Sequence, residues 1–548
     1  MLKRLLVNFR LLLGLVFLSL VLYACAQRGR PDGGPLDEDP PEIVVERPPN
    51  FSTHFKRDEI QIVFNEFVKL DKPRDQIIFS PPIEPRPIVT PMGLPAKFVG
   101  VELDMDSLQP NTTYSINFGL SIEDNNEGNK FPFYRYVFST GDYIDSLNIQ
   151  GRIYDPVQRE ADEFISIMMY ELDSTYTDSV VFKKNPRYIT YTVDSTNFFS
   201  LENLKEGKYR LVALSDKANN YRFAPAQDKI GFLADTITLP EDDLRYVEFP
   251  IFKEILDFKP DRPKQDKKNR IMFGYTGEVT EDNYDIRLLT DVPDDFKTSI
   301  IKDPETDTLY YWFKPFVEKD SLLFTFNNGS LKKLDTLKIF PKDMEKDSLV
   351  IEEKVKGNIK MNQDYYLTST VPIVNFNKDS IRLLRVSDSV FLPYDTSLDK
   401  FNNKFYVTFE KEVNTTYEVQ LFPGAVRGFF DETNDTITTR ITTPKPSQFG
   451  NMQITIQNLK EGPKIIQFVD KSDKVKYEQF ATKRQIFEFE LIEPGDYYIR
   501  VVYDTNDNKK WDTGNYLKGI QPERIVYFPK PFTIRANWDY SEVITMPD

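Results

Sequence analysis

The sequence predicts an all-β protein built as a tandem array of small β-sandwich domains. Short runs of alternating apolar and polar residues recur along the chain, as at 406–409 (YVTF) and 487–491 (FEFEL). Phenylalanine and tyrosine, which favour strands, number 43 and 29. Amphipathic helical patterns of more than about ten residues are nearly absent after the N-terminal segment. A chain of 548 residues corresponds to about three to five domains of ordinary size.

Residues 1–24 are predicted to be a signal peptide. A basic start is followed by an apolar run at 11–22, which is too short to span a bilayer but suits a secretory signal. The stretch 22–25 (LYAC) resembles the lipobox of bacterial lipoproteins, in which the cysteine is diacylated and becomes the new N-terminus. Each buried CH₂ of an acyl chain contributes about 0.8 kcal/mol, so lipid on Cys25 would hold the mature chain at a membrane. Cys25 is also the only cysteine, which excludes an intramolecular disulfide.

Residues 25–41 are predicted to form a flexible lipidated tether, because they consist mostly of glycine, proline and charged residues. From 42 to 145, which we call domain 1, short β runs alternate with turn residues. About seven strands in about a hundred residues is the rhythm of an immunoglobulin-like (Ig-like) sandwich. The sequence therefore predicts an Ig-like domain immediately after the tether.

Several stretches of domain 1 carry a more specific resemblance. They are similar to the bacterial Ig-like domain that opens a group of large Bacteroidota lipoproteins, and they lie at 40–44 (PPEIV), 63–68 (VFNEFV), 111–114 (NTTY) and 138–142 (FSTGD). The Gly-Gly-Pro of the tether, at 33–35, also resembles theirs. The resemblance implies an exported, membrane-anchored, multi-domain β protein, and it implies no catalytic activity.

Two internal repeats predict a modular layout for the rest of the chain. A Gly-x-Tyr motif at 207–209 is followed by Asp216, and a second one at 495–497 is followed at the same offset by Asp504. This pattern resembles the small prealbumin-like sandwiches of the carboxypeptidase-regulatory and collagen-adhesin-B type. The Asn-Thr-Thr-Tyr of domain 1 recurs at 414–417. We therefore expect four further domains: domain 2 (146–252, carboxypeptidase-regulatory-like), domain 3 (253–345, a β-sandwich), domain 4 (346–444, Ig-like) and domain 5 (445–548, carboxypeptidase-regulatory-like).

Charge and composition exclude several classes of function. The net charge is −15 and no Lys/Arg cluster is visible, which argues against a nucleic-acid partner. His54 is the only histidine, so sites that need several histidines or a Cys-His pair are excluded. A Ser-His-Asp triad would depend on His54, which lies in a polar loop, and nothing in the order of the chain singles out a carboxylate pair. The sequence predicts that the protein is not an enzyme.

The segment that most resembles a ligand site is 504–515 (DTNDNKKWDTGN). Oxygen-bearing side chains at its positions 1, 3, 5 and 9 follow the start of a calcium-binding loop, and they are Asp504, Asn506, Asn508 and Asp512. The glycine and the bidentate glutamate of such a loop are replaced by Lys509 and Asn515. The pattern therefore predicts weak calcium binding, at about 10⁻⁴ to 10⁻³ M. The alternative is a polar loop in which Asp and Asn cap their own backbone. No other cofactor is expected.

A short motif of Asp, then Ser or Thr, then an aliphatic residue recurs through the chain. It resembles the O-glycosylation signal of exported Bacteroidota proteins, and it is also what a turn entering a strand produces. The predicted acceptor hydroxyls are Ser107, Ser146, Ser179, Thr236, Thr308, Ser321, Thr336, Ser348, Ser380, Ser389 and Thr436.

These features predict a non-catalytic lipoprotein of the outer membrane, anchored by Cys25, with the cell surface preferred over the periplasmic face. The expected role is an interaction scaffold, more specifically an accessory subunit of an outer-membrane β-barrel complex for assembly, export or uptake, by analogy. The alternative is a surface adhesin or carbohydrate-binding lipoprotein. There the aromatic runs at 310–313 and 429–430 would stack on sugars, with Trp312 and Trp511 as test residues, whereas in a plain sandwich such residues fill the core.

Overall fold

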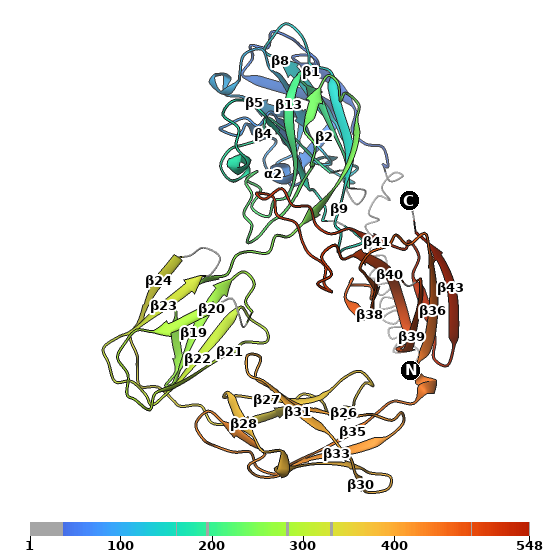
Figure 1. Ribbon diagram of the computed structural model, residues 1–548. Coiled ribbons are helices and arrows are strands. Elements are labelled where there is room, and N and C mark those ends of the chain that lie inside the picture. The colour runs from blue at the N-terminus through green and yellow to red at the C-terminus, as the bar shows by residue number, and fades with distance from the viewer. Residues whose placement is uncertain are drawn as a thin grey trace, which may run out of the picture. The chain divides into compact units, whose positions relative to one another are not determined.

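The protein is described by a computed structural model that covers residues 37–546 except 161, 193–196, 281–283, 329–332 and 484. The described chain is nearly all β-structure, which confirms the predicted fold class (Figure 1). Helical segments are short: α2 (Pro73–Gln76) and the 3₁₀ turns η1 (Met105–Ser107), η2 (Asp178–Phe182), η4 (Lys378–Ser380) and η5 (Pro446–Gln448). Within this described part, no helix has the length and apolar character needed to cross a membrane. The chain divides into two compact units, Met1–Ile144 and Asp145–Asp548.

The first unit contains domain 1, a sandwich of two antiparallel sheets. Its strands are β1 (Ile43–Arg47), β2 (Glu59–Leu70), β3 (Ile78–Ser80), β4 (Ile88–Thr90), β5 (Ala96–Glu102), β6 (Thr113–Asn117), β7 (Ile122–Asp124) and β8 (Arg135–Ser139). One sheet has the order β1-β2-β5-β4, with β7 on β2, and the other has the order β3-β6-β8. Alternation along β2 places Ile60, Ile62 and Phe64 in the core between the sheets, as the period-2 pattern predicts.

The second unit begins with domain 2. Its strands are β9 (Leu147–Tyr154), β10 (Ser166–Glu171), β11 (Tyr188–Tyr191), β12 (Phe198–Leu204), β13 (Gly207–Ser215), β14 (Lys229–Phe232), β15 (Ile237–Leu239) and β16 (Tyr246–Phe252). They follow the order β11-β10-β13-β14-β16-β9-β12, with β15 on β13. Strands β9 and β16 pair in parallel, and Gly151 on β9 allows their close approach, because a Cβ there would lie 2.2 Å from the Val247 carbonyl oxygen.

Domain 3 is a sandwich of sheets β17-β19-β22-β21, with β18 on β19, and β20-β23-β24. Its strands are β17 (Lys259–Pro260), β18 (Lys264–Lys267), β19 (Arg270–Thr276), β20 (Tyr284–Leu288), β21 (Lys297–Lys302), β22 (Thr308–Lys314), β23 (Leu322–Asn328) and β24 (Lys333–Ile339). Phe273, Tyr311 and Phe324 lie at the centre of its core, and Phe401 of domain 4 joins that core from outside.

Domain 4 has sheets β25-β27-β32-β31 and β26-β35-β33-β29-β30, with the short pair β28-β34. Its strands are β25 (Ile351–Glu353), β26 (Gly357–Asn358), β27 (Tyr365–Ser369), β28 (Ile373–Phe376), β29 (Ile381–Arg385), β30 (Val390–Phe391), β31 (Asp395–Asp399), β32 (Lys404–Thr408), β33 (Thr416–Leu421), β34 (Val426–Gly428) and β35 (Ile437–Thr442).

Domain 5 has sheets β39-β36-β43 and β38-β37-β40-β41, with β42 on β40. Its strands are β36 (Gly450–Gln457), β37 (Lys464–Val469), β38 (Val475–Ala481), β39 (Ile486–Ile492), β40 (Gly495–Tyr503), β41 (Ile525–Tyr527), β42 (Phe532–Ile534) and β43 (Asp539–Thr545). The parallel pair β36-β43 corresponds to β9-β16 of domain 2.

The Asn-Thr-Thr-Tyr repeat of domains 1 and 4 forms the same hydrogen bonds in both places. The Tyr114 hydroxyl accepts from the Gln109 amide, and the Tyr417 hydroxyl accepts from the Glu412 amide, each at 2.7 Å. The Asn that opens each motif has a positive φ, 49° at Asn111 and 53° at 414. Thus one local structure, a loop closed by a strand tyrosine, is used twice.

The Gly-x-Tyr repeat of domains 2 and 5 is likewise structural. Tyr209 donates to the Lys205 carbonyl at 3.0 Å, and Tyr497 donates to the Glu493 carbonyl at 2.9 Å. Burial raises the pKa of both tyrosines, so the hydroxyls remain protonated donors. In each domain a second tyrosine lies 5.9 Å away, ring centroid to ring centroid, and accepts from the same residue's amide.

Domains 2 and 5 also pack against each other within the second unit, which the sequence pattern did not predict. Arg159 Nε donates to Asp473 Oδ1 at 2.8 Å, and its guanidinium lies 3.5 Å from the ring centroid of Tyr498. Arg500 donates to the Val157 carbonyl at 3.0 Å. The Val157 side chain packs among apolar residues of β37, β40 and β41.

Candidate functional site

The predicted lipidation residue, Cys25, lies outside the described residues, as do the signal peptide and most of the tether. The last part of the tether is bound to domain 1. Asn129 Nδ2 donates to the carbonyls of Asp37 and Asp39, at 2.8 and 3.2 Å. The lipid anchor therefore stays a prediction.

His54 lies at the surface of domain 1. Its Nε2 is 2.9 Å from Asp142 Oδ1, and its Nδ1 is 3.3 Å from Thr53 Oγ1. The side chains of His54 and Asp142 are 63% and 86% exposed. A catalytic triad relies on a carboxylate shielded from water and on preorganised oxyanion donors. The side chains of His54 and Asp142, in contrast, are exposed to solvent. The arrangement is that of an exposed surface contact.

The four predicted calcium ligands lie in one loop, which follows β40. The buried Asp504 carboxylate accepts from the backbone amides of Asn508 and Lys509, at 3.1 and 2.9 Å. The Asp512 carboxylate accepts from the side-chain amides of Asn506 and Asn508, at 2.5 and 2.7 Å. Lys509 has φ 63°, the conformation for which a calcium loop uses glycine. The oxygens that would hold a cation are therefore engaged in closing the loop.

Domain 2 contains the same loop without the calcium-like pattern. Asp216 accepts from the amides of residues 220 and 221, the same offsets that Asp504 uses in domain 5. A second acid closes each loop: Asp228 accepts from residues 217 and 224, and Glu523 accepts from residues 505 and 512. The same geometry occurs in domain 2, where positions 3 and 9 of the pattern are Ala218 and Ala224 and carry no side-chain oxygen, so backbone capping accounts for Asp504. Calcium binding stays a prediction; among the described residues, no three His, Cys, Asp or Glu side chains are grouped as a metal site.

The domain 5 loop also contacts domain 2 and the first residues of domain 3, which follow β16 directly. Thr513 Oγ1 donates to the Lys253 carbonyl at 2.7 Å, and the Tyr516 amide donates to Glu254 Oε1 at 2.5 Å. The Tyr516 ring packs edge-on against Phe232, with centroids 5.4 Å apart. The most site-like segment of the sequence is thus part of an interface between two domains of the same chain.

The aromatic runs proposed as sugar platforms are covered. Trp312 is 1% exposed and packs with Val371 and Phe429 where domain 3 meets domain 4. Trp511 is half-buried, and its indole nitrogen donates to the Glu523 carbonyl at 2.9 Å. Trp312 does not present a face to a ligand, which corrects its suggested role, because it fills a contact between domains. A role of the half-buried Trp511 in sugar binding stays a prediction.

The predicted glycosylation hydroxyls differ in exposure. Thr308, on β22, is buried at 8% exposure and does not present its hydroxyl to solvent. The others are exposed or half-buried. Ser107 shows the alternative role of the motif, since its hydroxyl donates to Asp104 in the η1 turn at 3.1 Å. Modification of the exposed sites stays a prediction.

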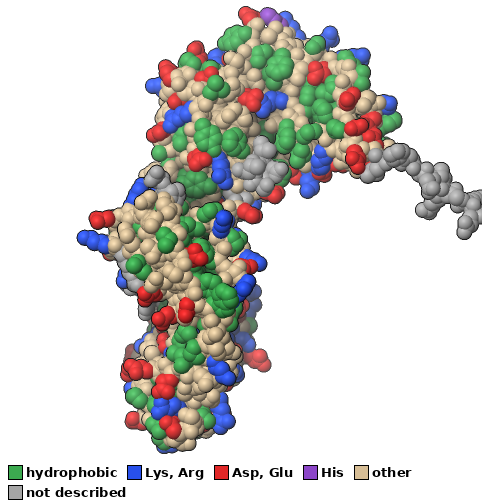
Figure 2. Space-filling model, turned by 90° about the vertical axis from the view of Figure 1, so that its right-hand side faces the viewer, with side chains coloured by type: hydrophobic (Ala, Val, Ile, Leu, Met, Phe, Trp, Pro, Cys, Tyr) green, Lys and Arg blue, Asp and Glu red, His purple; other side chains and the backbone are tan. Residues whose placement is uncertain are grey.

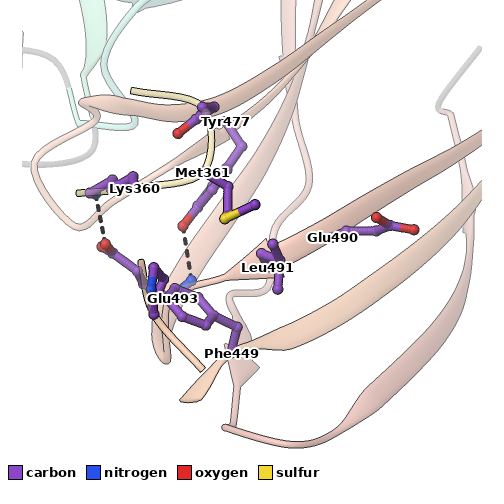
Figure 3. A pocket seen from close by; sticks show the side chains of 9 residues that line it. Lys360, Met361, Phe449, Tyr477, Glu490, Leu491 and Glu493 are labelled. Carbon is purple, nitrogen blue, oxygen red and sulfur yellow. Dashed lines mark hydrogen bonds and ion pairs between the residues drawn. The ribbon is translucent and has the colours of Figure 1, made fainter. Parts of the chain in front are cut away.

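An apolar slot lies at the junction of domains 4 and 5 (Figure 3). It has a volume of about 240 Å³, and its apolar lining comes from Met361, Phe449, Tyr477 and Leu491. Lys360 of domain 4 and Glu493 of domain 5 form an ion pair of 2.6 Å at its edge, drawn as a dashed line in the figure. The Tyr477 hydroxyl accepts from the Glu493 amide at 2.8 Å, which fixes the tyrosine in the wall.

The slot is the middle of a longer groove. On one side a hollow of about 440 Å³ with a mixed lining shares Lys360, Pro444, Phe449 and Glu493 with it. On the other side a hollow along β38 and β39 shares Asn362, Tyr477 and Glu490 with it. The three hollows therefore follow one another from domain 4 across the junction and along the two edge strands.

Leu491 has an unusual backbone conformation in the wall of this slot. Its φ is 54°, in the left-handed region that costs a residue with a side chain about 1 to 2 kcal/mol. The corresponding residue of domain 2 is Asn203, at φ 59°, and asparagine adopts this region far more readily. The sequence motifs did not indicate a role for Leu491. A difference between the two repeats marks this position. Four residues before the glycine of the Gly-x-Tyr motif, domain 5 has leucine where domain 2 has asparagine.

Charged side chains are mixed over the surface. On the face shown in Figure 2, acidic and basic groups alternate among apolar patches, and no continuous basic stripe is visible on the described residues there. The absence of a nucleic-acid partner stays a prediction.

Comparison with known families identifies domain 1. Residues 37–140 match the family described as the bacterial Ig-like domain. This match confirms that domain 1 resembles a bacterial Ig-like domain. No curated protein matches the chain.

The chain is also similar to solved multi-domain β structures. The FN1–FN3 domains of chicken CNTN1 have 10% identity and a TM-score of 0.14, and the match covers 51% of this chain and 99% of that chain. SGBP-B of the mixed-linkage glucan utilization locus of Bacteroides ovatus, in complex with a mixed-linkage heptasaccharide, has 12% identity and a TM-score of 0.16, with 71% and 94% covered. The I67–I69 fragment of titin has 9% identity and a TM-score of 0.12, with 54% and 100% covered. At these scores the similarities carry no functional argument.

Proposed function

We propose that this protein is a non-catalytic lipoprotein scaffold of the outer membrane, anchored through acyl chains on Cys25, and that it serves as an accessory subunit of an outer-membrane β-barrel complex. The anchor follows from the lipobox-like stretch at 22–25. The scaffold role follows from an array of β-sandwiches that includes a bacterial Ig-like domain. Assembly, export or uptake is the process in which such a subunit would take part.

The observation that supports the scaffold role most is the packing of domain 5 against domain 2. Val157 and Arg159 of domain 2 contact domain 5, and Glu254, directly after the end of domain 2, contacts it as well. When the domains of an array are packed against one another, their relative positions are already restricted. Such an array therefore loses less conformational entropy on binding a partner than a chain of independently moving domains does. This construction suits a protein that positions a partner.

The anchor is tested by replacing the lipidated residue. Cys25→Ala removes the acylation site, so the protein is expected to leave the membrane fraction and appear in the soluble fraction, measured by fractionation and immunoblotting. Gln27→Ala, which leaves Cys25 in place, is the matched control. A Cys25→Ala protein that has lost its signal peptide and still sediments with membranes would show that lipid does not hold it.

The accessory-subunit role is tested by mild-detergent pull-down of the tagged protein from native membranes with quantitative mass spectrometry. A stoichiometric β-barrel membrane protein is the expected partner. Recovery of the protein alone, in detergent that preserves known envelope complexes, would contradict the proposal and favour the adhesin or carbohydrate-binding alternative.

One observation favours that second candidate. Phe198 and Tyr246, 39% and 50% exposed, lie with ring centroids 5.7 Å apart on the outer face of domain 2. They flank β9 where Gln150 and Arg152 are their cross-strand partners. Exposed rings beside planar polar groups suit the apolar faces and hydroxyls of sugars. Glycan-array binding that is lost in Phe198→Ala and Tyr246→Ala would support this candidate.

A further inference from the structure

We propose that the groove at the junction of domains 4 and 5 binds an extended segment of a partner polypeptide. In this complex an apolar side chain of the segment enters the slot beside Leu491, and basic side chains lie along β38 and β39. The inference rests on the proposed scaffold function, because it names the place where the scaffold holds its partner.

The slot has the size and lining of an anchor pocket. A cavity of about 150 Å³ lined by apolar side chains accepts benzene, so a slot of about 240 Å³ has room for one leucine-sized or aromatic side chain. Met361 and Phe449 are half-buried, so they offer apolar surface without being part of a closed core. Anchors of this kind, in which one side chain fills a pocket, contribute most of the affinity in many interfaces.

The backbone conformation of Leu491 independently indicates that this wall has a role besides folding. In the other copy of the repeat, the residue with the same positive φ is Asn203, whose side chain donates to the Asp145 carbonyl at 2.9 Å. At Leu491 an apolar side chain occupies a conformation that it disfavours. Strained positions of this type concentrate at binding sites, because a function maintains them against the folding preference.

The flank of the groove along β38 and β39 is acidic. Glu478, Glu488 and Glu490 line it. Glu478 and Glu488 accept from the neutral amides of Gln467 and Gln453, each at 3.1 Å, so these contacts leave their negative charge uncompensated. Lys476, the basic residue of this flank, has its own partner in Asp470 at 3.2 Å. Charge complementarity therefore favours a partner segment with lysine or arginine on this side.

The groove also offers backbone groups, which favours a polypeptide over other apolar or basic ligands. In the described sheets β38 and β39 are terminal strands, one in each layer of domain 5. Gln479 Nε2 donates to the Glu488 carbonyl at 2.5 Å, where a side-chain amide takes the position of a strand amide. An extended segment can replace such a contact by pairing its backbone with the edge strand.

The test uses the purified full-length protein and a panel of short fluorescent peptides. Each peptide carries one central Leu, Ile, Phe, Met, Tyr or Trp flanked by alternating Lys and Thr, and a matched panel carries Glu in place of Lys. Fluorescence polarisation is expected to show binding of at least one Lys peptide, weakened by salt, and no binding of the Glu panel.

The key variant is Leu491→Asn, which installs the residue that the other repeat uses in the same backbone conformation. It is expected to fold at least as stably as the parent protein, and to bind the peptide at least about tenfold more weakly because the apolar wall is lost. Glu488→Lys with Glu490→Lys is expected to weaken binding similarly. Ile486→Asn, an exposed apolar residue on the same strand outside the groove, is the matched control and should bind as the parent does.

Three results would overturn the inference: no peptide of either panel binds, both panels bind equally, or Leu491→Asn binds like the parent. The proposed function is judged separately, by the pull-down of the Leu491→Asn protein from native membranes. If the parent protein and this variant retain a β-barrel partner equally well, the partner does not bind in the groove, and the accessory role still holds. The absence of any partner with the parent would contradict the accessory role itself.

Discussion

Single acidic side chains close several loops of this protein, and Asp124 is the most complete example. Its carboxylate accepts from the amides of residues 126, 127, 128 and 129, at 2.7 to 3.1 Å. Burial alone would raise the pKa of Asp124, but these four hydrogen bonds outweigh it and lower the pKa. The Asn-rich turn at 124–129 is thus organised by one charge at its start.

Asp124 should therefore stabilise domain 1 in a pH-dependent way. A carboxyl whose pKa is lower in the folded state stabilises above its unfolded pKa of about 3.9, and this contribution is lost as the pH falls through the folded pKa. Asp124→Asn, which cannot accept all four bonds, is expected to cost about 1 to 3 kcal/mol at neutral pH. Thermal unfolding from pH 7 to 3 measures both effects. A variant as stable as the parent at pH 7 would refute the capping role.

At the scale of elements, the loop after the Gly-x-Tyr strand is a repeated unit with two different surroundings. In domain 2 it stays against its own domain, where Phe223 packs on Phe182 at 5.4 Å between centroids. In domain 5 the corresponding loop reaches another domain through Thr513 and Tyr516. The local hydrogen bonds are the same, so the difference lies in the longer exposed part of the loop, which carries the contact residues.

Asp504→Asn is expected to destabilise the domain 5 loop with or without calcium, because the carboxylate caps the backbone in both cases. The expected loss is about 1 to 3 kcal/mol, measured by thermal unfolding and by faster amide hydrogen exchange of residues 505–512. If calcium binds at about 10⁻⁴ M, 10 mM calcium would add about 2.7 kcal/mol to the parent and less to the variant. Equal stability of parent and variant in chelator would count against capping.

At the scale of the molecule, the contact between domains 2 and 5 ties together parts of the second unit that are far apart in sequence. Its centre is the pair Arg159 and Asp473, whose side chains are 24% and 16% exposed. Burial alone would lower the pKa of Arg159, but its hydrogen bond and charge interaction with Asp473 outweigh this and raise it. Tyr498 covers the other face of the guanidinium. A shielded pair of this geometry contributes more than an exposed one.

A double-mutant cycle measures that contact. Arg159→Ala and Asp473→Ala are each expected to weaken the packing of domain 5 on domain 2, with a coupling energy of about 1 to 2 kcal/mol from thermal unfolding. Hydrogen exchange at β9 and β40 should rise in both variants. Lys354→Ala, which breaks the exposed pair with Glu352, is the control and should change little. Additive effects in the cycle would show that the two side chains do not interact.

Much of the architecture could be predicted because the strands and the repeated motifs depend on local sequence patterns. Period-2 alternation identified the strands, as along β2 and β39, and the two repeats marked corresponding strands in domains 1 and 4 and in domains 2 and 5. The role of the loop at 504–515 is ambiguous in the sequence, because Asp and Asn at alternate positions can bind a cation or cap the backbone. Only the contacts of Asp504 and Asp512 show which bonds form in the described chain.

The sequence by itself determined the all-β class, the repeated motifs and the prediction of a lipid anchor, since each depends on residues that are close together along the chain. The tertiary structure alone decided which surfaces are covered. The residues around Trp312 in the sequence do not indicate whether its side chain is exposed or buried. It is buried because Phe429, which is far away along the chain, packs on it. The same holds for the Leu491 slot, which exists only where domain 4 meets domain 5. Contacts between distant segments depend on the summed packing of whole domains, which no local pattern encodes.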